Sequence, residues 1–294
     1  MGLAGICFAL MIGCVKVVRQ DFSALEVIVF RGIVAVPLSI LIVYFTPGRP
    51  IKINNKRVFS LRLLFGLGAM YCYYTAAHGL ALADLSLITR LQPILIALLA
   101  PVLLGAQERS DGRIWVLLVA GVVGCLVLLA PQLMVGSLWG LWAVGAMLSS
   151  ALAHLALRAM GPTERTQAVV LWTQVGIFLV TGLMLALATD GLTALPSPTQ
   201  WLWIIGLGSL ATLGQLLMTR AYALDQASVV AGASNLTPLW AAIVDLVLFS
   251  TILSMNAFIG GVLIVGASLS LLFRPKVREK HQDASRESEA SRAL

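Results

Sequence analysis

The sequence predicts an all-α membrane protein whose ten transmembrane helices form two inverted five-helix repeats around a central cavity. Three observations support this: an apolar composition, a regular succession of apolar segments, and a proline motif that recurs about half a chain apart. Of the 294 residues, 59% are hydrophobic and 11% are charged. A soluble domain carries about 25% charged residues. Lipid must therefore cover the surface that charged residues would cover in a soluble fold.

Ten apolar segments have the length of a transmembrane helix, which is about 20 residues. The first is not a secretory signal peptide, because its basic residues, Lys16 and Arg19, follow the apolar run. We therefore expect a true first span that begins at or near Met1. The ten predicted spans are residues 2–18, 24–46, 58–80, 84–105, 112–130, 137–158, 166–188, 200–220, 227–250 and 254–273.

If the N-terminus is cytoplasmic, most of the 20 Lys and Arg residues lie on the cytoplasmic side of the membrane. Arg62 is counted with these cytoplasmic residues. Cytoplasmic loops carry the excess of basic residues, so we expect both termini on the cytoplasmic side of a bacterial inner membrane. Residues 274–294 form a polar cytoplasmic tail, which we expect to be disordered. The net charge of +7 does not indicate nucleic-acid binding, because the charges lie in loops and the tail.

A proline motif divides the chain into two repeats, residues 1–130 and 131–273. Leu91-Gln92-Pro93 in the fourth span matches Leu236-Thr237-Pro238 in the ninth. Because each repeat holds five spans, an odd number, the second must be inverted relative to the first. Inverted repeats with matching interruptions are typical of secondary transporters, whose substrate site lies at the interrupted spans. A proline that merely bends a packed helix explains the motif equally well.

These motifs resemble those of EamA-type proteins of the drug/metabolite transporter superfamily. The resemblance covers residues 1–273, and it implies a ten-helix carrier of small metabolites, similar to amino-acid exporters of the YddG type. The matching segments are Phe8 to Lys16, Glu26 to Gly32, Leu91 to Glu108, Gly121 to Gly124, Leu236 to Pro238 and Gly260 to Gly266.

Polar and aromatic residues inside the spans are the candidates for a substrate site, because such groups are costly in lipid and usually face a cavity or a partner. Tyr71, Tyr74 and His78 of the third span share one helical face. This pattern is also expected of an aromatic belt at the membrane interface. The candidates for the cavity are Tyr71, Tyr74, His78, Arg90, Gln92, Trp172, Asn235 and Thr237.

Four charged residues, Lys16, Arg31, Asp84 and Asp245, are candidates for gating or coupling. They fall in the outer parts of their spans, where they either pair with one another to close a gate or contact the substrate directly. Arginine is a fork-shaped donor for carboxylates, so Arg31 and Arg90 favour a carboxylated substrate.

The sequence indicates a secondary exporter of amino acids or related carboxylated compounds, working by alternating access. The alternative is a proton-coupled exporter of drugs or quaternary amines, in which Asp245 is the intramembrane acid. We expect no enzyme activity, metal or cofactor, since no catalytic, metal-ligand or nucleotide-binding pattern is found. The expected partners are a small-molecule substrate and the lipid bilayer, with a monomer as the plausible state. His154 and the Gly66-x-Gly68 pair are interpreted as helix packing.

Overall fold

A computed structural model describes residues 1–76, 88–129, 138–161, 163–188, 194–249 and 255–272. Within these ranges every regular element is helical and no strand occurs, which confirms the predicted all-α class. The predicted tail, residues 274–294, and the candidates His78 and Asp84 lie outside the described residues.

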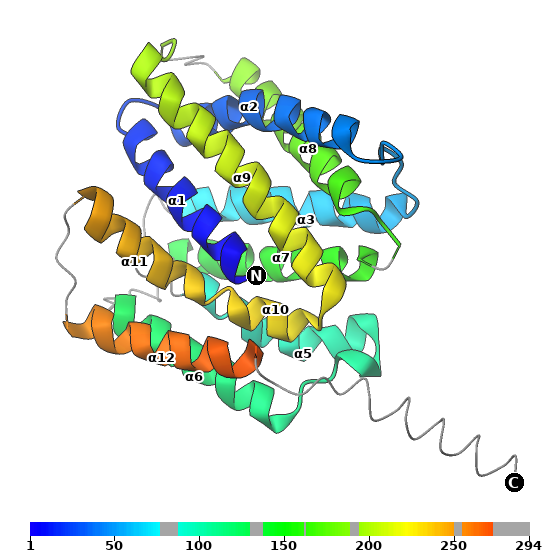
Figure 1. The fold of residues 1–294 in the computed structure, drawn as a ribbon, viewed down its shortest axis with the longest axis vertical. Coiled ribbons are helices and arrows are strands. Elements are labelled where there is room, and N and C mark those ends of the chain that lie inside the picture. The colour runs from blue at the N-terminus through cyan, green and yellow to red at the C-terminus, as the bar shows by residue number, and fades with distance from the viewer. Residues whose placement is uncertain (77–87, 130–137, 162, 189–193, 250–254, 273–294) are drawn as a thin grey trace, which may run out of the picture.

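The helices begin and end within a few residues of the predicted spans (Figure 1). The structure differs from the prediction in two spans. The ninth span consists of two helices, and the described part of the fourth span is also interrupted. The elements are α1 (Gly2–Val18), α2 (Ala24–Phe45), α3 (Lys56–Ala76), α5 (Gln92–Leu104), η1 (Ala106–Glu108), α6 (Gly112–Leu129), α7 (Leu138–Met160), α8 (Thr166–Leu187), α9 (Pro198–Leu224), α10 (Ala227–Ala233), α11 (Leu236–Phe249) and α12 (Met255–Leu272).

Capping boxes fix the beginnings of α2 and α9. The Ser23 hydroxyl accepts a hydrogen bond from the Glu26 amide at 3.3 Å, and the Glu26 carboxylate accepts one from the Ser23 amide at 2.7 Å. Ser197 and Gln200 repeat this arrangement at α9. Each box satisfies two amides that the helix itself leaves unbonded.

The fourth and ninth spans are broken at corresponding places. A turn at Leu91 separates the helical residues 88–90 from α5, and a turn at Ser234 and Asn235 separates α10 from α11. Pro93 and Pro238 lie in the first turn of the helix that follows each break. Proline is tolerated there because the first amides of a helix have no intrahelical partner. The prolines therefore mark interruptions rather than bends.

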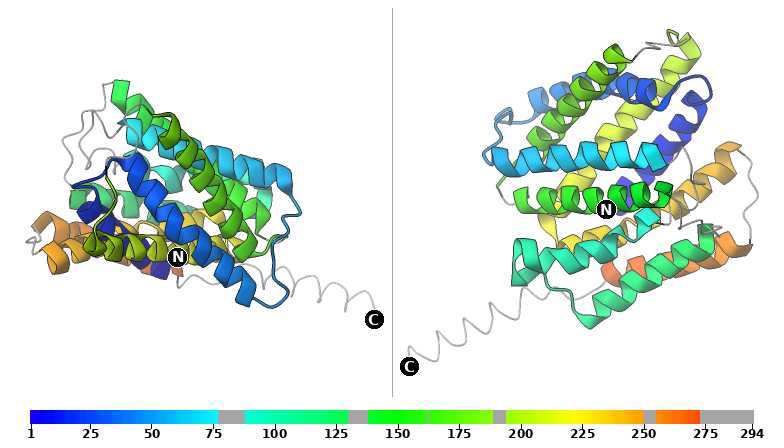
Figure 2. Two further views of the ribbon diagram at one scale, coloured as in Figure 1. Left: turned by 90° about the horizontal axis from the view of Figure 1, so that it is seen from above. Right: turned by 180° about the vertical axis from the view of Figure 1, so that it is seen from behind.

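The helices cross in layers (Figures 1 and 2). Helix α1 packs against α9 and α11, and α3 packs against α7. Helix α2 packs against α8 and α9, while α6 and α12 form a pair at one edge of the molecule. Helix α5 lies between α7 and α10, so the two broken spans meet inside the bundle.

Apolar side chains cover much of the outer surface. Among the described residues, α2, α7, α8 and α9 are long and apolar enough to cross a membrane, and four shorter helices are also apolar. Large hydrophobic side chains point outward along them: Val102 is 79% exposed and Leu187 is 75% exposed. Such a surface requires lipid as its surroundings.

The α6–α12 crossing depends on Gly124. A methyl group at this position would lie 2.8 Å from Ile264 Cγ1 and 3.0 Å from the Gly260 carbonyl oxygen. We expect Gly124→Ala to lower the free energy of unfolding by about 1–3 kcal/mol, because the helix backbones must separate. Thermal unfolding in detergent measures this. Gly266→Ala in α12, where the methyl group meets no atom within 4 Å, is the control. Equal stability of the two variants would contradict the assigned crossing.

Candidate functional site

The two breaks are joined by Arg90, which lies at the end of the helical residues 88–90. Its Nη1 donates a hydrogen bond to the Ser234 carbonyl at 3.2 Å, and its buried Nε has no partner. A helix break frees carbonyl groups that lipid cannot satisfy. The Ser234 carbonyl also accepts from the Thr237 amide at 3.0 Å. The arginine of the fourth span is thus a second donor at the break in the ninth, and the two interruptions face each other.

Gln92 extends this polar region towards α7. Its amide contacts His154 Nδ1 at 2.5 Å, and the same ring nitrogen lies 2.8 Å from the Ser150 carbonyl. The ring tautomer decides whether Nδ1 donates to the Ser150 carbonyl or accepts from Gln92 Nε2. The ring stacks on Tyr222 of α9, with centroids 5.1 Å apart. His154 therefore belongs to the polar interior, where sequence analysis had assigned it to helix packing.

Asn235 and Thr237 follow the break in the ninth span and are 1% and 6% exposed. A methyl group on Gly121 would lie 2.8 Å from Asn235 Nδ2, and one on Gly5 would lie 3.2 Å from Thr237 Oγ1. Glycines of α6 and α1 thus let these polar side chains fit between the helices. Asn235 Oδ1 is buried without a hydrogen-bond partner, so this region has an unused acceptor.

Arg31, Tyr71 and Trp172 lie apart from the breaks. Arg31 of α2 donates to the Gln174 side chain of α8 at 2.9 Å. Tyr71 is 56% exposed and meets Trp142 edge to face, with centroids 5.8 Å apart. Trp172 is 40% exposed and donates to the Ile51 carbonyl, in the connection between α2 and α3, at 2.7 Å. The structure thus does not bring Tyr71 and Trp172 to the polar interior.

For Lys16, Tyr74 and Asp245 the structure gives only the helix in which each lies and, for Lys16, its exposure. Lys16 is exposed near the end of α1. Tyr74 belongs to α3 and Asp245 to α11, but their side chains lie outside the described residues.

Arg62 also lies elsewhere than predicted from the sequence. It was counted with the cytoplasmic loops, but it lies within α3 and is 7% exposed. Arg62 interacts electrostatically with Tyr222 and His154. The available signal was its position inside the apolar part of the third span, where a basic residue is costly.

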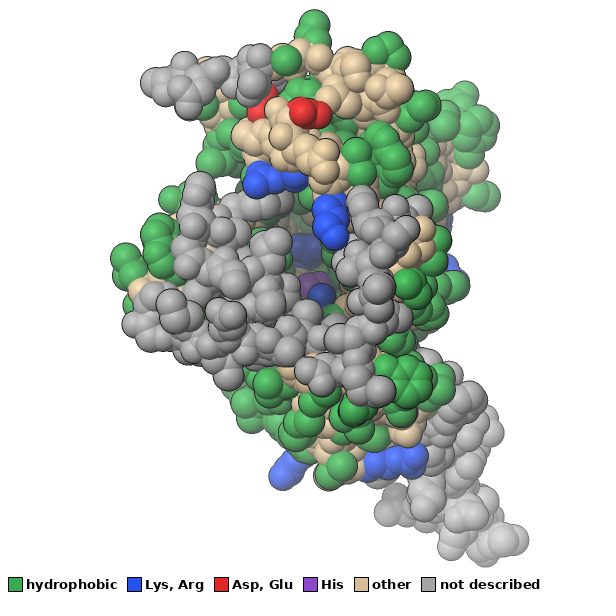
Figure 3. Space-filling view, turned by 90° about the vertical axis from the view of Figure 1, so that its left-hand side faces the viewer, with side chains coloured by type: hydrophobic (Ala, Val, Ile, Leu, Met, Phe, Trp, Pro, Cys, Tyr) green, Lys and Arg blue, Asp and Glu red, His purple; other side chains and the backbone are tan. Residues whose placement is uncertain are grey.

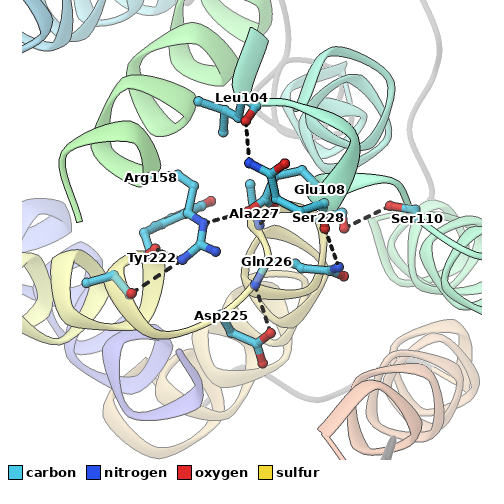
Figure 4. Close-up of polar contacts among 11 residues, drawn as sticks. Leu104, Glu108, Ser110, Arg158, Tyr222, Asp225, Gln226, Ala227 and Ser228 are labelled. Carbon is cyan, nitrogen blue, oxygen red and sulfur yellow. Dashed lines mark hydrogen bonds and ion pairs between the residues drawn. The ribbon is translucent and has the colours of Figure 1, made fainter. Parts of the chain in front are cut away.

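Glu108 holds together the end of the bundle at which α5, α7 and α9 terminate (Figure 4). Its carboxylate pairs with Arg158 Nε at 2.8 Å and accepts a hydrogen bond from the Ala227 amide at 2.9 Å. Arg158 Nη1 also donates to the Tyr222 carbonyl at 3.0 Å. These four residues, from η1, α7, α9 and α10, form the Glu108 cluster.

Glu164 makes a second such contact at the same end. Its carboxylate accepts hydrogen bonds from the Asn54 amide at 2.9 Å and from the Asn55 amide at 2.6 Å. These amides precede α3, so two carboxylates close this end by binding the beginnings of helices in the other half of the chain. A hollow opens on another face, with basic and histidine side chains visible in its depth (Figure 3).

Removal of the Glu108 carboxylate tests the closure of this end. We expect Glu108→Ala to lower the stability by about 3 kcal/mol, because it leaves Arg158 and the Ala227 amide without their acceptor. Glu108→Gln keeps an acceptor and should lose less. Thermal unfolding of the purified protein is the measurement, with Arg109→Ala at the neighbouring exposed position as the control. A Glu108→Ala variant as stable as this control would show that the cluster does not hold the end closed.

Together these features define a multi-span membrane protein with a polar interior at two facing helix breaks, an arrangement found in secondary transporters. The sequence profile of the EamA-like transporter family matches residues 1–130 and again 137–273. The chain therefore belongs to the EamA-like transporter family. It is an integral multi-pass membrane protein that transports small molecules, and the family contains transporters rather than enzymes.

Relatives over nearly the whole chain are also transporters. An uncharacterized transporter of Helicobacter pylori is 26% identical over 292 residues, covering 94% of each chain. The pseudopaline exporter CntI of Pseudomonas aeruginosa is 26% identical and covers 92% of this chain and 93% of its own. Human solute carrier family 35 member G1 is 25% identical over 85% of this chain and 71% of its own. A crystal structure 17% identical, with a TM-score of 0.77 over 92% of this chain and 96% of its own, shares the fold.

Proposed function

We propose that the protein is a secondary exporter of amino acids or related carboxylated metabolites, which binds its substrate at the two facing helix breaks. The observation that carries this proposal is the Arg90 guanidinium at the break of the ninth span, with Nη1 on the Ser234 carbonyl and Nε unpartnered. A guanidinium with unused donors is suited to a carboxylate. Gln92, Asn235 and Thr237, which lie at or next to the two breaks, add further donors and acceptors.

Two inverted repeats, residues 1–130 and 131–273, are part of the proposal. Several helix pairs support it, because exchanging each helix with its counterpart in the other half turns one packed pair into another. The pair α1–α9 becomes α7–α3, and α1–α11 becomes α7–α5. Two halves with the same set of contacts can exchange shapes, which is the basis of alternating access.

We further propose that the Glu108 end faces the cytoplasm, together with both termini, in a bacterial inner membrane. Basic residues support this orientation, because Arg49, Lys52, Arg109, Arg113 and Arg165 all lie in or beside the connections at that end. In this orientation the hollow of Figure 3 lies on the side away from the cytoplasm. The name of the Pseudomonas aeruginosa relative, an exporter of pseudopaline, supports export as the direction.

Transport by the purified protein in liposomes tests the substrate class. We expect accumulation of at least one labelled carboxylated compound from a panel of neutral, aromatic and acidic amino acids, with a quaternary amine for comparison. Arg90→Ala should reduce that accumulation at least about tenfold, because it removes a charge-assisted hydrogen bond to the carboxylate. The control is Arg113→Ala, which removes an exposed arginine.

Each compound is measured with and without a pH gradient. Transport that Arg90→Ala leaves unchanged would contradict the proposed site. Movement of the quaternary amine alone would contradict the proposed substrate class and would favour a drug exporter.

A further inference from the structure

Arg62 carries a buried charge for which the described residues supply no counter-ion. It is 7% exposed, its Nε atom has no hydrogen-bond partner, and no ion pair to it occurs in the described part of the chain. Arginine keeps its proton in proteins, and a buried charge without a partner costs several kcal/mol. The guanidinium therefore requires an anion that the described residues do not supply.

The buried acids of the described chain are all bonded elsewhere. They are Glu26, Glu108 and Glu164. Glu26 caps α2, Glu108 pairs with Arg158, and Glu164 binds the amides before α3. None of them pairs with Arg62, so no buried acid of the described residues neutralises it and its guanidinium can take an anion from outside the chain.

The surroundings of Arg62 supply further groups for an anion. Arg62 interacts electrostatically with the Tyr222 phenol and the His154 ring, which stack on each other. The three side chains come from α3, α9 and α7, and so from both halves of the chain. A guanidinium, a phenol and an imidazole can each donate a hydrogen bond to a carboxylate. The Gln92–His154 contact connects this group to the region of Arg90.

We propose that Arg62, His154 and Tyr222 bind a second carboxylate of the transported compound, so that the preferred substrates carry two carboxylates. This inference rests on the proposed function, in which Arg90 binds the first. A substrate with one carboxylate would leave one of the two buried guanidinium groups uncompensated. A dicarboxylated substrate compensates both, and its two ends lie along the polar row formed by Arg90, Gln92, His154 and Arg62.

Matched acid and amide pairs test the proposal in liposomes that contain the full chain. The probes are labelled glutamate against glutamine, and aspartate against asparagine, which differ in the charge of one end. We expect the wild type to accumulate the acids in preference to the amides. Arg62→Gln should lower accumulation of the acids about tenfold and leave that of the amides unchanged. Such a change in selectivity does not follow from a general loss of folded protein.

Gly66 provides a second variant that keeps the arginine. A methyl group at Gly66 would lie 2.7 Å from Arg62 Nη1, so Gly66→Ala displaces the guanidinium while alanine favours the helix. The expected result is the same loss of preference for the acids. Gly68→Ala is the control on the same helix, because its methyl group would meet Ser149 at the ordinary distance of 3.7 Å.

The outcomes separate this inference from the proposed function. If the wild type moves no carboxylated compound, the proposed function itself fails. If the wild type transports the amides as well as the acids, or if Arg62→Gln and Gly66→Ala keep the preference for the acids, the second carboxylate site is wrong and the proposed function stands.

Discussion

The hydrogen bond from Arg90 to the Ser234 carbonyl is the contact on which the interior depends. A helix in lipid satisfies its own backbone, and a broken helix does not. The Ser234 carbonyl at the break in the ninth span accepts from the Thr237 amide, and the fourth span supplies a second donor to it beside its own break. The two interruptions are thereby held together, and the polar side chains next to them are gathered in one region rather than spread along the bundle.

Several features around this contact follow from the need to seat polar groups between closely packed helices. Glycines of α1 and α6 leave room for Thr237 and Asn235. The α6–α12 pair is close enough at Gly124 to form a compact edge. At the Glu108 end, by contrast, polar contacts between connections hold the halves together. One end of the bundle is thus fastened by buried hydrogen bonds and an ion pair beside the apolar core that contains Tyr222 and Ala227.

Much of the helical pattern could be predicted from the sequence, because a length of about 20 apolar residues is a strong signal. The motif around Pro93 and Pro238 also predicted matching interruptions, and breaks occur one turn before each proline. The site residues were less predictable. Gln92, Asn235 and Thr237 lie at the breaks as expected, whereas Trp172 binds the Ile51 carbonyl outside that region. Helical periodicity shows which residues share a face, but it does not show which helix that face meets.

Arg62 and His154 show the same difficulty for charged residues. Lys56 and Arg57 precede Arg62 in the sequence, and this run of basic residues predicts a loop position for Arg62. Only the packing of α3 against α7 shows that its side chain points inward, near His154 and Tyr222. The small residues near His154 predict helix packing, and α3 does pack against α7. The same packing brings the side chains of Arg62 and His154 together.

The carboxylates at the Glu108 end bind backbone amides as well as a side chain, and this has a consequence for divergence within the family. Glu164 uses the amides of residues 54 and 55, and Glu108 uses that of residue 227. Every amino acid except proline supplies an amide. The contacts with Glu108 and Glu164 therefore exclude only proline at these three positions. Other contacts restrict them further: the Asn54 side chain donates to the Thr163 carbonyl, the Asn55 side chain accepts from the Val58 amide, and Ala227 is fully buried.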